Sequence, residues 1–498
     1  MRRTKILVTV GPATDSTEGM TKLLRSGADA FRLNFSHGTD DEHRTLLARM
    51  HAASRQAHRE VAIVADVQGP KLRIGNLVGH GVNLAAGQTW ILDRDARPGN
   101  THRVGIEIPL LKRVAEPGDP VLLGDGSVEL RVEQAGPESI VTRVVSGGFV
   151  SAHAGLFLPR ARLRTSVFAE KDRHDAAIAL VGGIDFLALS FVRNGADLAE
   201  ARRWLDRAPG GRDVGLIAKI ERAEALAAIG DIVRSSDGIM VARGDLGIEV
   251  PLERLALEQK RLIREANANG RFVIVATQML LSMTGAPRPT RAEATDVANA
   301  VLDGADAVML SEESAVGKFP FDAVRWLDRI AVATESAYDP QSVRDRLALE
   351  NSKAPEIAHE RSVAAAAVHL AEGVKARAIV TPTHSGRTAR LVAGLRPACP
   401  VLALSGVPAT RRHLSLVRGV EARLTPLHAD LEQLRRSAVE IARSRGLRGK
   451  GPIVLTAGYP VEGRPTNLVT LVDGEEPSPP LRSRPRSAPG SASRGRPR

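Results

Sequence analysis

The sequence contains eight apolar runs rich in Val, Ile, Leu and Ala, each of a length that suits a buried β-strand. Most of them are separated by stretches rich in Ala, Leu and Arg with helical spacing. Strands that are apolar along their whole length and alternate with helices are typical of a parallel sheet covered on both faces. Eight such units predict an α/β fold, a closed (β/α)8 TIM barrel. The runs are residues 5–11, 28–36, 61–67, 186–192, 215–220, 238–244, 272–277 and 305–311.

The third and fourth runs are too far apart to be joined by one helix. The chain between them, residues 70–164, has short alternating strands separated by Gly, Pro and Asp turns. It predicts a small inserted β-barrel domain, which leaves the catalytic barrel (residues 1–69 and 165–345) at the carboxyl end of a strand. We expect a lid over that end, with a passive insertion as the alternative.

A second α/β unit follows the barrel. We expect an open α/β domain of regulatory type over residues 350–473, with a helix at 362–372. Residues 474–498 are rich in Pro, Ser, Gly and Arg, so we expect a disordered basic tail. The predicted strands of the second unit are residues 378–382, 400–405, 451–457 and 469–472.

The formal net charge of +12 does not by itself indicate a nucleic-acid-binding protein, because half of the excess lies in the tail, which carries six arginines after residue 476. A weak electrostatic contact of the tail with RNA or an acidic surface stays a minor alternative. The single cysteine, Cys399, excludes an internal disulfide. No run is long enough to span a bilayer, and the short first run is followed by Gly-Pro, which favours a strand over a signal peptide. We therefore expect a cytoplasmic protein without a membrane partner.

Charged side chains stand where the fifth and sixth runs end. Lys219 and Glu221 lie in the segment 218–221 (AKIE), and Asp245 lies in 241–247 (VARGDLG). Chemistry in such barrels takes place at the carboxyl ends of the strands. Two carboxylates there could share Mg²⁺, which proteins hold with one or two carboxylates plus substrate oxygens. This pattern indicates a site for phosphoryl transfer or for an enolate.

Other strand ends add cations and hydroxyls. Arg32, Arg73 and Lys219 suit an anionic, phosphorylated substrate, because phosphoryl transfer depends mainly on positioning and charge neutralisation. Gly244 would let backbone N–H groups approach a carboxylate, and the Thr277 hydroxyl could relay a proton through water. The remaining polar strand ends are Asn34, Ser36, His37, Asp66, Ser190, Arg243, Gln278, Ser311 and Glu313.

Seven segments follow one another in the order of a known family. They are 4–13 (TKILVTVGPA), 32–38 (RLNFSHG), 218–221 (AKIE), 242–247 (ARGDLG), 276–280 (ATQML), 289–293 (PTRAE) and 296–306 (DVANAVLDGAD). Together they resemble the pyruvate kinase family over almost the whole length of the chain. The resemblance implies transfer of the phosphoryl group of phosphoenolpyruvate to ADP, giving ATP and, after protonation of the enolate, pyruvate in the final step of glycolysis.

The resemblance also implies roles for single residues. Glu221 and Asp245 match the ligands of Mg²⁺ or Mn²⁺, and Lys219 matches the cation that stabilises the phosphoryl group in transfer. Lys219, Thr277 and Arg32 are the implied catalytic residues, with Thr277 starting the proton relay. The implied substrate-binding residues are Arg32, Ser190, Lys219, Gly244, Asp245 and Thr277, and the implied nucleotide contacts are Asn34, His37 and Arg73.

One departure from the family pattern concerns a monovalent cation. Many members hold K⁺ with residues that match Asn34, Ser36, Asp66 and a threonine, but this chain has Val67 at the threonine position. It also has Lys71 where such members have a glutamate. A lysine ammonium is itself a monovalent cation, so we expect Lys71 to lie near Asn34, Ser36 and Asp66 and to replace K⁺. The alternative is that Lys71 is only a surface residue at the lid hinge.

Two further segments remain open. Residues 311–314 (SEES) carry an extra acidic residue, Glu312, and Val316 replaces a lysine common in the family. The segment 383–390 (THSGRTAR) suits a phosphate cradle at a helix start, which the resemblance implies binds a phosphorylated effector. Helix capping by Ser385 or Thr388 is the alternative. The expected effector residues are Thr383, Ser385, Gly386, Arg387 and Thr388.

Two other functions compete with an active kinase. The first is another metal-dependent barrel enzyme, such as a lyase or aldolase acting on phosphoenolpyruvate or pyruvate enolate. It needs neither the cluster of Arg32, Asn34 and His37 nor an inserted lid. The second is a catalytically idle relative, which the presence of Lys219 and Glu221 argues against. The resemblance also implies a homotetramer.

Overall fold

The computed structural model describes residues 2–106, 115–124, 126–158, 166–340, 358–426, 430–447, 451–458 and 466–473. All eight predicted runs form strands of one closed parallel barrel, in the order β1-β16-β15-β14-β13-β12-β3-β2. The prediction of a (β/α)8 barrel is therefore confirmed. The strands are β1 (Lys5–Thr9), β2 (Ala30–Asn34), β3 (Ala62–Asp66), β12 (Phe186–Leu189), β13 (Gly215–Ile220), β14 (Gly238–Ala242), β15 (Phe272–Ala276) and β16 (Ala307–Leu310).

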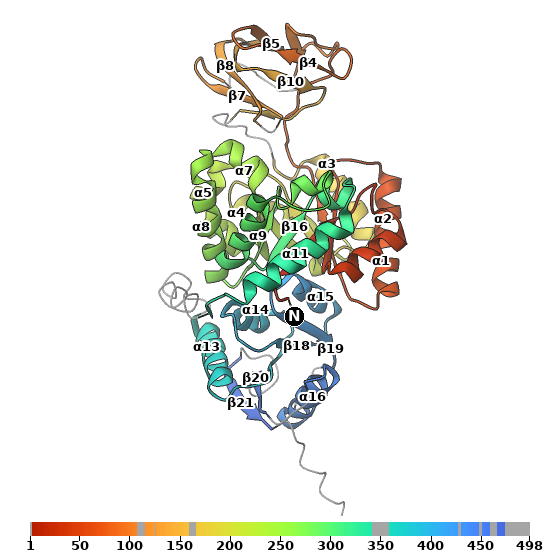
Figure 1. Cartoon of the computed structure of the whole chain (residues 1–498), viewed down its shortest axis with the longest axis vertical. Helices are drawn as coiled ribbons and strands as arrows, with labels where there is room; N and C mark the ends of the chain where they lie inside the picture. The colour runs from red at the N-terminus through yellow and green to blue at the C-terminus, as the bar shows by residue number, and fades with distance from the viewer. Residues whose placement is uncertain are drawn as a thin grey trace, which may run out of the picture.

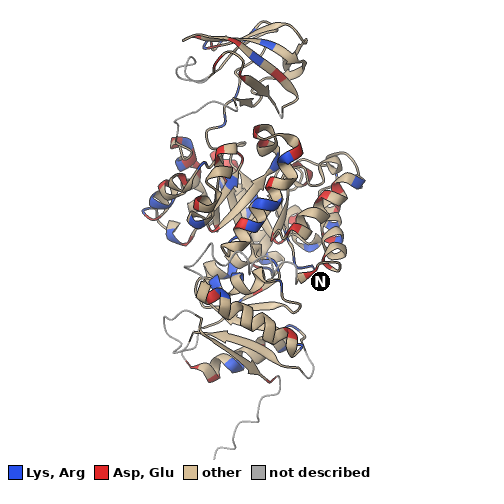
Figure 2. Ribbon diagram, turned by 90° about the vertical axis from the view of Figure 1, so that its left-hand side faces the viewer, with Lys and Arg blue, Asp and Glu red and all other residues tan. Residues whose placement is uncertain are grey.

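An outer layer of helices covers the barrel. Two of the longer helices begin with a capping box, Thr39 with Glu42 and Thr290 with Glu293, which satisfies free N–H groups of the first turn. Their apolar faces pack on the strands, while acidic and basic residues alternate on the outside (Figure 2). The helices are α1 (Thr17–Ser26), α2 (Asp40–Gln56), α3 (Glu170–Val181), α4 (Gly195–Leu205), α5 (Ala223–Ala227), α6 (Ile229–Ser235), α7 (Arg243–Glu249), α8 (Leu255–Ala268), α9 (Arg291–Asp303), α10 (Glu312–Ala315) and α11 (Pro320–Glu335), with short 3-10 turns at Gly211–Asp213, Leu252–Arg254 and Leu281–Thr284.

The segment between β3 and α3 forms a separate all-β unit above the barrel (Figure 1). Its described strands make a six-stranded and a two-stranded sheet around one apolar core that contains the fully buried Trp90. These strands form two sheets rather than one closed ring. They are β4 (Gly81–Leu84), β5 (Thr89–Asp93), β6 (Arg103–Gly105), β7 (Pro120–Leu123), β8 (Val128–Ala135), β9 (Ser139–Ser146), β10 (Gly148–Ser151) and β11 (Leu156–Phe157).

One carboxylate lies where this inserted unit joins the barrel. The backbone N–H of Gly69, just after β3, donates to Asp172 Oδ1 at 2.8 Å. The backbone N–H of Ala169, where the chain comes back from the insert, donates to Asp172 Oδ2 at 3.0 Å. Gly69 has φ +64°, a conformation that glycine adopts without strain. Asp172 therefore fastens together the two chain segments that connect the insert to the barrel.

The C-terminal unit is a five-stranded sheet in the order β19-β18-β17-β20-β21, parallel except for β21. The sequence analysis missed β19, because its sequence VEARL lacks a continuous apolar run and it lies at the sheet edge. The elements are α13 (Ala358–Gly373), β17 (Ile379–Pro382), α14 (Arg387–Gly394), β18 (Val401–Ser405), α15 (Pro408–His413), a 3-10 turn at Leu414–Leu416, β19 (Val420–Leu424), α16 (Leu431–Ser444), β20 (Ile453–Ala457) and β21 (Leu468–Val472).

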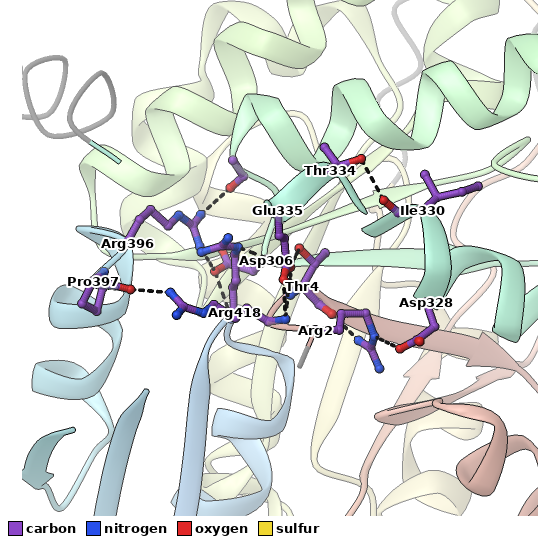
Figure 3. A network of polar contacts seen from close by, with 12 residues as sticks. Arg2, Thr4, Asp306, Asp328, Ile330, Thr334, Glu335, Arg396, Pro397 and Arg418 are labelled. Carbon is purple, nitrogen blue, oxygen red and sulfur yellow. Dashed lines mark hydrogen bonds and ion pairs between the residues drawn. The ribbon is translucent and has the colours of Figure 1, made fainter. Parts of the chain in front are cut away.

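This C-terminal unit packs against the amino ends of the barrel strands. Its apolar residues continue the core of the barrel interior, and the ring of His413 lies 4.5 Å from that of Phe186. A polar network also joins the two units (Figure 3). Arg396 donates to Asp306 Oδ1 at 3.3 Å and to the carbonyl of Gly304 at 2.5 Å. We call the network of Arg3, Asp306, Glu335, Arg396 and Arg418 the basal network.

The expected basic tail lies outside the described residues, as do parts of the predicted insert and of the link between the barrel and the C-terminal unit. Among the described helices, none combines the length and the apolar character needed to cross a bilayer.

Candidate active site

Lys219 stands at the centre of a group of polar side chains at the carboxyl ends of the strands. Its Nζ lies 3.1 Å from Asp66 Oδ1 and 3.0 Å from Glu221 Oε1, and it donates to Ser190 Oγ at 2.7 Å. These residues come from β13 and from the ends of β3 and β12, so barrel closure brings them together. We call Arg32, Asp66, Lys219, Glu221 and Asp245 the rim centre.

Arg32 shares Asp66 with Lys219. Arg32 Nε and one terminal nitrogen each lie 2.7 Å from Asp66 Oδ2, and the other terminal nitrogen donates to Thr9 Oγ1 at 3.0 Å. The Arg32 side chain is only 11% exposed and that of Asp66 is 1% exposed. A buried charge needs such pairing, so Asp66 fixes the position of both cations.

The charges of the rim centre shift the pKa values of its members. Burial opposes the charged form of Asp66, but Lys219 and Arg32 outweigh it and lower the pKa of this carboxyl. Burial likewise opposes charge on Lys219, but Asp66 and Glu221 raise its pKa above the ordinary value. Glu221 has a raised pKa because of burial and the nearby carboxylates, despite Lys219. The lysine is therefore held as a cation.

Glu221 and Asp245 offer hard oxygen ligands. Glu221 Oε2 accepts the N–H of Phe191 at 2.8 Å, and Phe191 itself has φ +58°, an uncommon conformation for a bulky residue. Among the described residues, no three His, Cys, Asp or Glu side chains are grouped to hold a metal. The buried Glu221 and the partly exposed Asp245 fit Mg²⁺ or Mn²⁺ that takes its other ligands from substrate and water, while Asp66 is occupied by Arg32 and Lys219.

Lys71 does not contact the set that the sequence analysis expected. Its Nζ lies 2.9 Å from Asp245 Oδ1 and 5.4 Å from the centre of the Phe157 ring. In the part of the chain that the structure describes, Asp245 is its hydrogen-bond partner, instead of Asn34, Ser36 or Asp66. The reason is geometric: Lys71 follows the turn at Gly69-Pro70, and its long stem reaches across the rim toward α7.

The end of β15 is a strained turn. Thr277 and Gln278 have φ +67° and +55°, which costs a non-glycine residue on the order of 1 kcal/mol or more. Arg243 stabilises the turn because its guanidinium donates to the Thr277 carbonyl at 2.7 Å and pairs with Asp296 at 2.6 Å. Gly244 N–H donates to Thr277 Oγ1 at 2.8 Å. Gly244 and Thr277 thus meet beside Asp245.

The residues expected to contact the nucleotide come from two units: Asn34 and His37 stand at and after the end of β2 of the barrel, and Arg73 belongs to the inserted unit. The pKa of His37 is lowered by partial burial and by the nearby charges of Arg73, Arg32 and Lys71. Arg73 is on the inserted unit, where it donates to the carbonyl of His153 at 3.0 Å. Asn34 Oδ1 accepts the N–H of Ser36 at 3.2 Å. The charge of Arg73 on the inserted unit thus acts on His37 of the barrel, although the two residues belong to different units.

The residues expected to bind an effector divide into two groups. Thr383 Oγ1 accepts the N–H of Gly386 at 2.9 Å, and the hydroxyls of Thr388 and Thr466 lie 2.6 Å apart. Ser385 and Arg387 instead line a cavity. Helix α14 begins after Gly386, and neither Ser385 nor Thr388 caps it.

The segment 311–314 is hydrogen-bonded to the loop that follows β15. Glu313 is buried and accepts the N–H groups of Leu280 and Ser311 at 3.0 and 2.7 Å, while Glu312 is exposed. Val316 is 58% exposed. The structure gives no reason for the presence of Glu312 or Val316.

The sequence analysis missed three groups that hold the site residues in place. Thr9 supports Arg32, the Phe191 N–H holds Glu221, and Asp296 holds Arg243. Asp296 lies within one of the family segments, so the sequence did carry a signal for it. The Phe191 contribution is a backbone group and has no sequence signature.

Comparison with known proteins shows similarity to one family over most of the chain. A model of the pyruvate kinase barrel domain matches residues 1–324, and a model of the pyruvate kinase alpha/beta domain matches residues 361–472. Pyruvate kinase of Geobacillus stearothermophilus is 40% identical over 476 residues, covering 94% of this chain and 80% of the relative. The enzyme of Methylorubrum extorquens is also 40% identical, covering 94% of this chain and 97% of the relative.

A solved structure gives the same result. The crystal structure of a pyruvate kinase from Cryptosporidium parvum superposes with a TM-score of 0.89 at 35% identity, covering 95% of this chain and 96% of the other. The two family models together span most of the chain, and both relatives are aligned over nearly all of it. This chain belongs to the pyruvate kinase family.

Proposed function

We propose that the rim centre carries out the reaction of this family, the transfer of the phosphoryl group of phosphoenolpyruvate to ADP, which gives ATP and pyruvate. The observation that carries this assignment of residues is the contact of Lys219 with Asp66, Glu221 and Ser190 at 2.7–3.1 Å. It holds one buried ammonium where anionic oxygens must be neutralised. Electrostatic stabilisation of this kind is the main contribution of a protein to phosphoryl transfer.

Arg32 and Lys219 bind the phosphoryl group of the substrate in this proposal. Asp66 orients both cations before the substrate arrives, so little rearrangement is needed during transfer. Ser190 helps to hold the ammonium of Lys219 through its hydroxyl. The substrate carboxylate approaches Gly244, Asp245 and Thr277, where the small Gly244 leaves backbone accessible.

A divalent cation would be held by Glu221 and Asp245. When bound, Mg²⁺ or Mn²⁺ supplies positive charge beside the phosphoryl oxygens. Thr277 holds the proton that passes, through water, to the enolate carbon. Its hydroxyl is kept in place by Gly244 and by the Ala276 carbonyl, which it contacts at 2.6 Å.

We propose that the inserted unit acts as a lid over ADP. Asn34 and His37 on the barrel and Arg73 on the insert contact the nucleotide phosphates, so binding would draw the two units together. Exclusion of water limits competing hydrolysis. The proposed division is the barrel at 1–69 and 165–345, the lid at 70–164, a C-terminal domain at 350–473 and the tail at 474–498.

Lys71 provides a resident monovalent cation in this proposal, so the enzyme belongs to a K⁺-independent branch. Its ammonium pairs with Asp245 within the rim centre at 2.9 Å and adds its charge to the electrostatic surroundings of His37. The positive charge that K⁺ supplies in other members is thus present at the rim from the chain itself.

We further propose a cytoplasmic homotetramer that responds to a phosphorylated effector. The resemblance to the family supports the assembly. The cavity lined by Ser385 and Arg387 supports the effector.

A coupled assay with lactate dehydrogenase tests the proposed function. Phosphoenolpyruvate, ADP and Mg²⁺ should together give pyruvate, with the rate dependent on ADP. Release of phosphate or pyruvate without ADP would favour a lyase or hydrolase, and no turnover by folded protein would favour an idle relative.

A further inference from the structure

Asp172 is a buried carboxylate at the start of α3, where the chain has returned from the inserted unit. Its Oδ2 accepts the N–H of Ala169 at 3.0 Å, which is an ordinary helix-capping contact between residues three apart. Its Oδ1 accepts the N–H of Gly69 at 2.8 Å, and Gly69 lies 103 residues earlier, where the chain leaves the barrel. Helix capping explains the first contact but not the second.

The burial of this carboxylate is unfavourable unless polar groups surround it. Burial raises the pKa of Asp172, and the hydrogen bond from the Gly69 N–H is the strongest effect in the opposite direction. The hydrogen bond from Ala169 is the next strongest. The charged form of Asp172 therefore depends on both connections of the inserted unit being in place.

The outgoing connection is very short, and we call residues 69–72 the hinge. Gly69 is bound to the barrel through Asp172, whereas the carbonyl of Leu72 accepts the N–H of Leu156 in β11 of the inserted unit at 2.9 Å. Only Pro70 and Lys71 lie between these two fixed points, and proline allows little change in φ. The direction in which the inserted unit leaves the barrel therefore depends on where Gly69 is held.

The hinge backbone packs directly on two groups that hold rim side chains. A Cβ added to Gly69 would lie 3.0 Å from the Cβ of Ser190 and 3.2 Å from Cδ2 of Phe191. Ser190 accepts a hydrogen bond from Lys219, and the N–H of Phe191 donates to Glu221. A displacement of Gly69 would therefore loosen the packing behind both rim side chains.

The hinge also directs Lys71 toward the rim. The N–H of Lys71 donates to the carbonyl of Gly69 at 2.8 Å, which closes a tight turn. From this turn the Lys71 ammonium reaches Asp245 Oδ1 at 2.9 Å. The position of Gly69 thus affects the rim through a second route besides its packing on β12.

We propose that Asp172 is a positioning residue for the reaction, whose carboxylate fixes Gly69 to the barrel so that the inserted unit moves only about Pro70 and Lys71. The inference rests on the proposed function, in which the inserted unit closes over ADP. With Gly69 held, the inserted unit can change its orientation while the packing behind Lys219 and Glu221 stays in place. Without the Asp172 contact, Gly69 becomes part of the moving segment, and lid motion disturbs the rim.

Asp172→Asn in the full chain tests this proposal. Asparagine keeps one acceptor oxygen but turns an amide NH₂ group toward the second N–H donor, so Gly69 and Ala169 cannot both be bound. The matched control is Asp175→Asn, the same change at a buried side chain one turn later in α3. Asp175 pairs with Lys171 of the same helix at 2.6 Å.

Three measurements follow the effect. Hydrogen–deuterium exchange should show faster uptake in Asp172→Asn for peptides that contain Gly69 or Ala169. The KM for ADP should rise by about fivefold, with a smaller change in the KM for phosphoenolpyruvate. A larger fraction of phosphoenolpyruvate should be hydrolysed, because water gains access: the water oxygen bonds to phosphorus as the bond to the enolate oxygen breaks, which gives phosphate and pyruvate. Asp175→Asn should change none of the three.

Unaltered exchange in Asp172→Asn would overturn the proposal. Faster exchange with an unaltered KM for ADP and unaltered hydrolysis would also overturn it, because Asp172 would then only cap α3. If Asp172→Asn does not fold, Gly69→Ala disturbs the same hydrogen bond from the barrel side, through its φ of +64° and its close contacts, and should give the same three changes. A parent without kinase activity would refute the proposed function, whereas the exchange measurement would still show whether Asp172 holds the hinge.

Discussion

Both ends of the barrel hold charged side chains, but the groups that pair with the cations differ between the two ends. At the rim centre, the cations Arg32 and Lys219 are paired with carboxylates at strand ends, and the neighbouring Lys71 is paired with Asp245. In the basal network, Arg396 and Arg3 also donate to main-chain carbonyls of the neighbouring unit or loop.

The two ends also differ in how far the charged side chains are enclosed by the rest of the protein. Backbone carbonyls and apolar packing enclose the basal charges, so the network joins the barrel to the C-terminal unit. The rim charges are matched mainly with one another and face the inserted unit. Arginine and lysine side chains thus hold two units together at one end of the barrel and, as we propose, take part in catalysis at the other.

The largest effect is expected when a lysine is replaced by methionine at the rim, and the same replacement at the basal end is the control. Lys219→Met should lower kcat by about 10³-fold, because it removes preorganised positive charge from the rim. Lys5→Met removes a partly buried lysine at the basal end, which donates to the Val420 carbonyl at 3.0 Å, and it should leave kcat unchanged. The coupled assay on folded protein, checked by circular dichroism, measures both. A rate retained in Lys219→Met would refute its catalytic role.

The basal network is tested through stability. Arg396→Met leaves the buried Asp306 without its guanidinium, and breaking such a pair costs about 3 kcal/mol or more. We expect a lower unfolding temperature with kcat unchanged below the transition. Arg207→Met at an exposed site is the matched control. An unaltered unfolding temperature would show that the network is not structurally important.

The Lys71 proposal predicts a change in cation dependence. The parent enzyme should show little gain in rate when K⁺ is added to buffer free of K⁺ and Na⁺. Lys71→Glu should be slow in that buffer and should gain about tenfold or more with K⁺, because it replaces a resident cation with a carboxylate. Initial rates across a K⁺ titration measure this. Strong K⁺ activation of the parent would contradict the proposal.

The smallest effect concerns acid stability at the basal end. Burial opposes ionisation of Asp29, but Arg2, Lys5 and Arg59 together lower its pKa. A lowered carboxyl pKa stabilises the fold above the unfolded-state pKa of about 3.9, and this stabilisation is lost as the pH falls through the folded-state value.

Asp29→Asn should therefore lower stability by about 1 kcal/mol at neutral pH. The difference from the parent in unfolding temperature should stay constant from neutral pH to about pH 5 and shrink below about pH 4. Unfolding followed at several pH values measures this difference. A gap that does not change with pH would mean that the Asp29 charge is not responsible.

The sequence was sufficient for features that depend on continuous or local patterns. All eight barrel strands were predicted because buried parallel strands are apolar throughout, whereas β19 was missed because Glu421 and Arg423 interrupt its pattern. The proximity of Lys219, Glu221 and Asp245 followed from strand ends meeting at one rim.

Contacts that depend on side-chain reach or backbone conformation were not accessible in the same way. The ammonium of Lys71 has a flexible stem, so its pairing with Asp245 could not be read from residue order. The left-handed backbone of Phe191, whose N–H holds Glu221, also has no sequence signature in a bulky residue. Both follow from tertiary packing alone.

The Asp172 contacts bear on how the chain could assemble. Asp172 receives N–H groups from Gly69 and Ala169, which flank a long insertion. Closing a long loop carries an entropic cost that grows only slowly with its length, and these two hydrogen bonds help to offset it. We expect the barrel strands before and after the insert to assemble into one barrel whether or not the insert has folded. The insert would then be a module that evolution can lengthen, shorten or exchange without rebuilding the barrel.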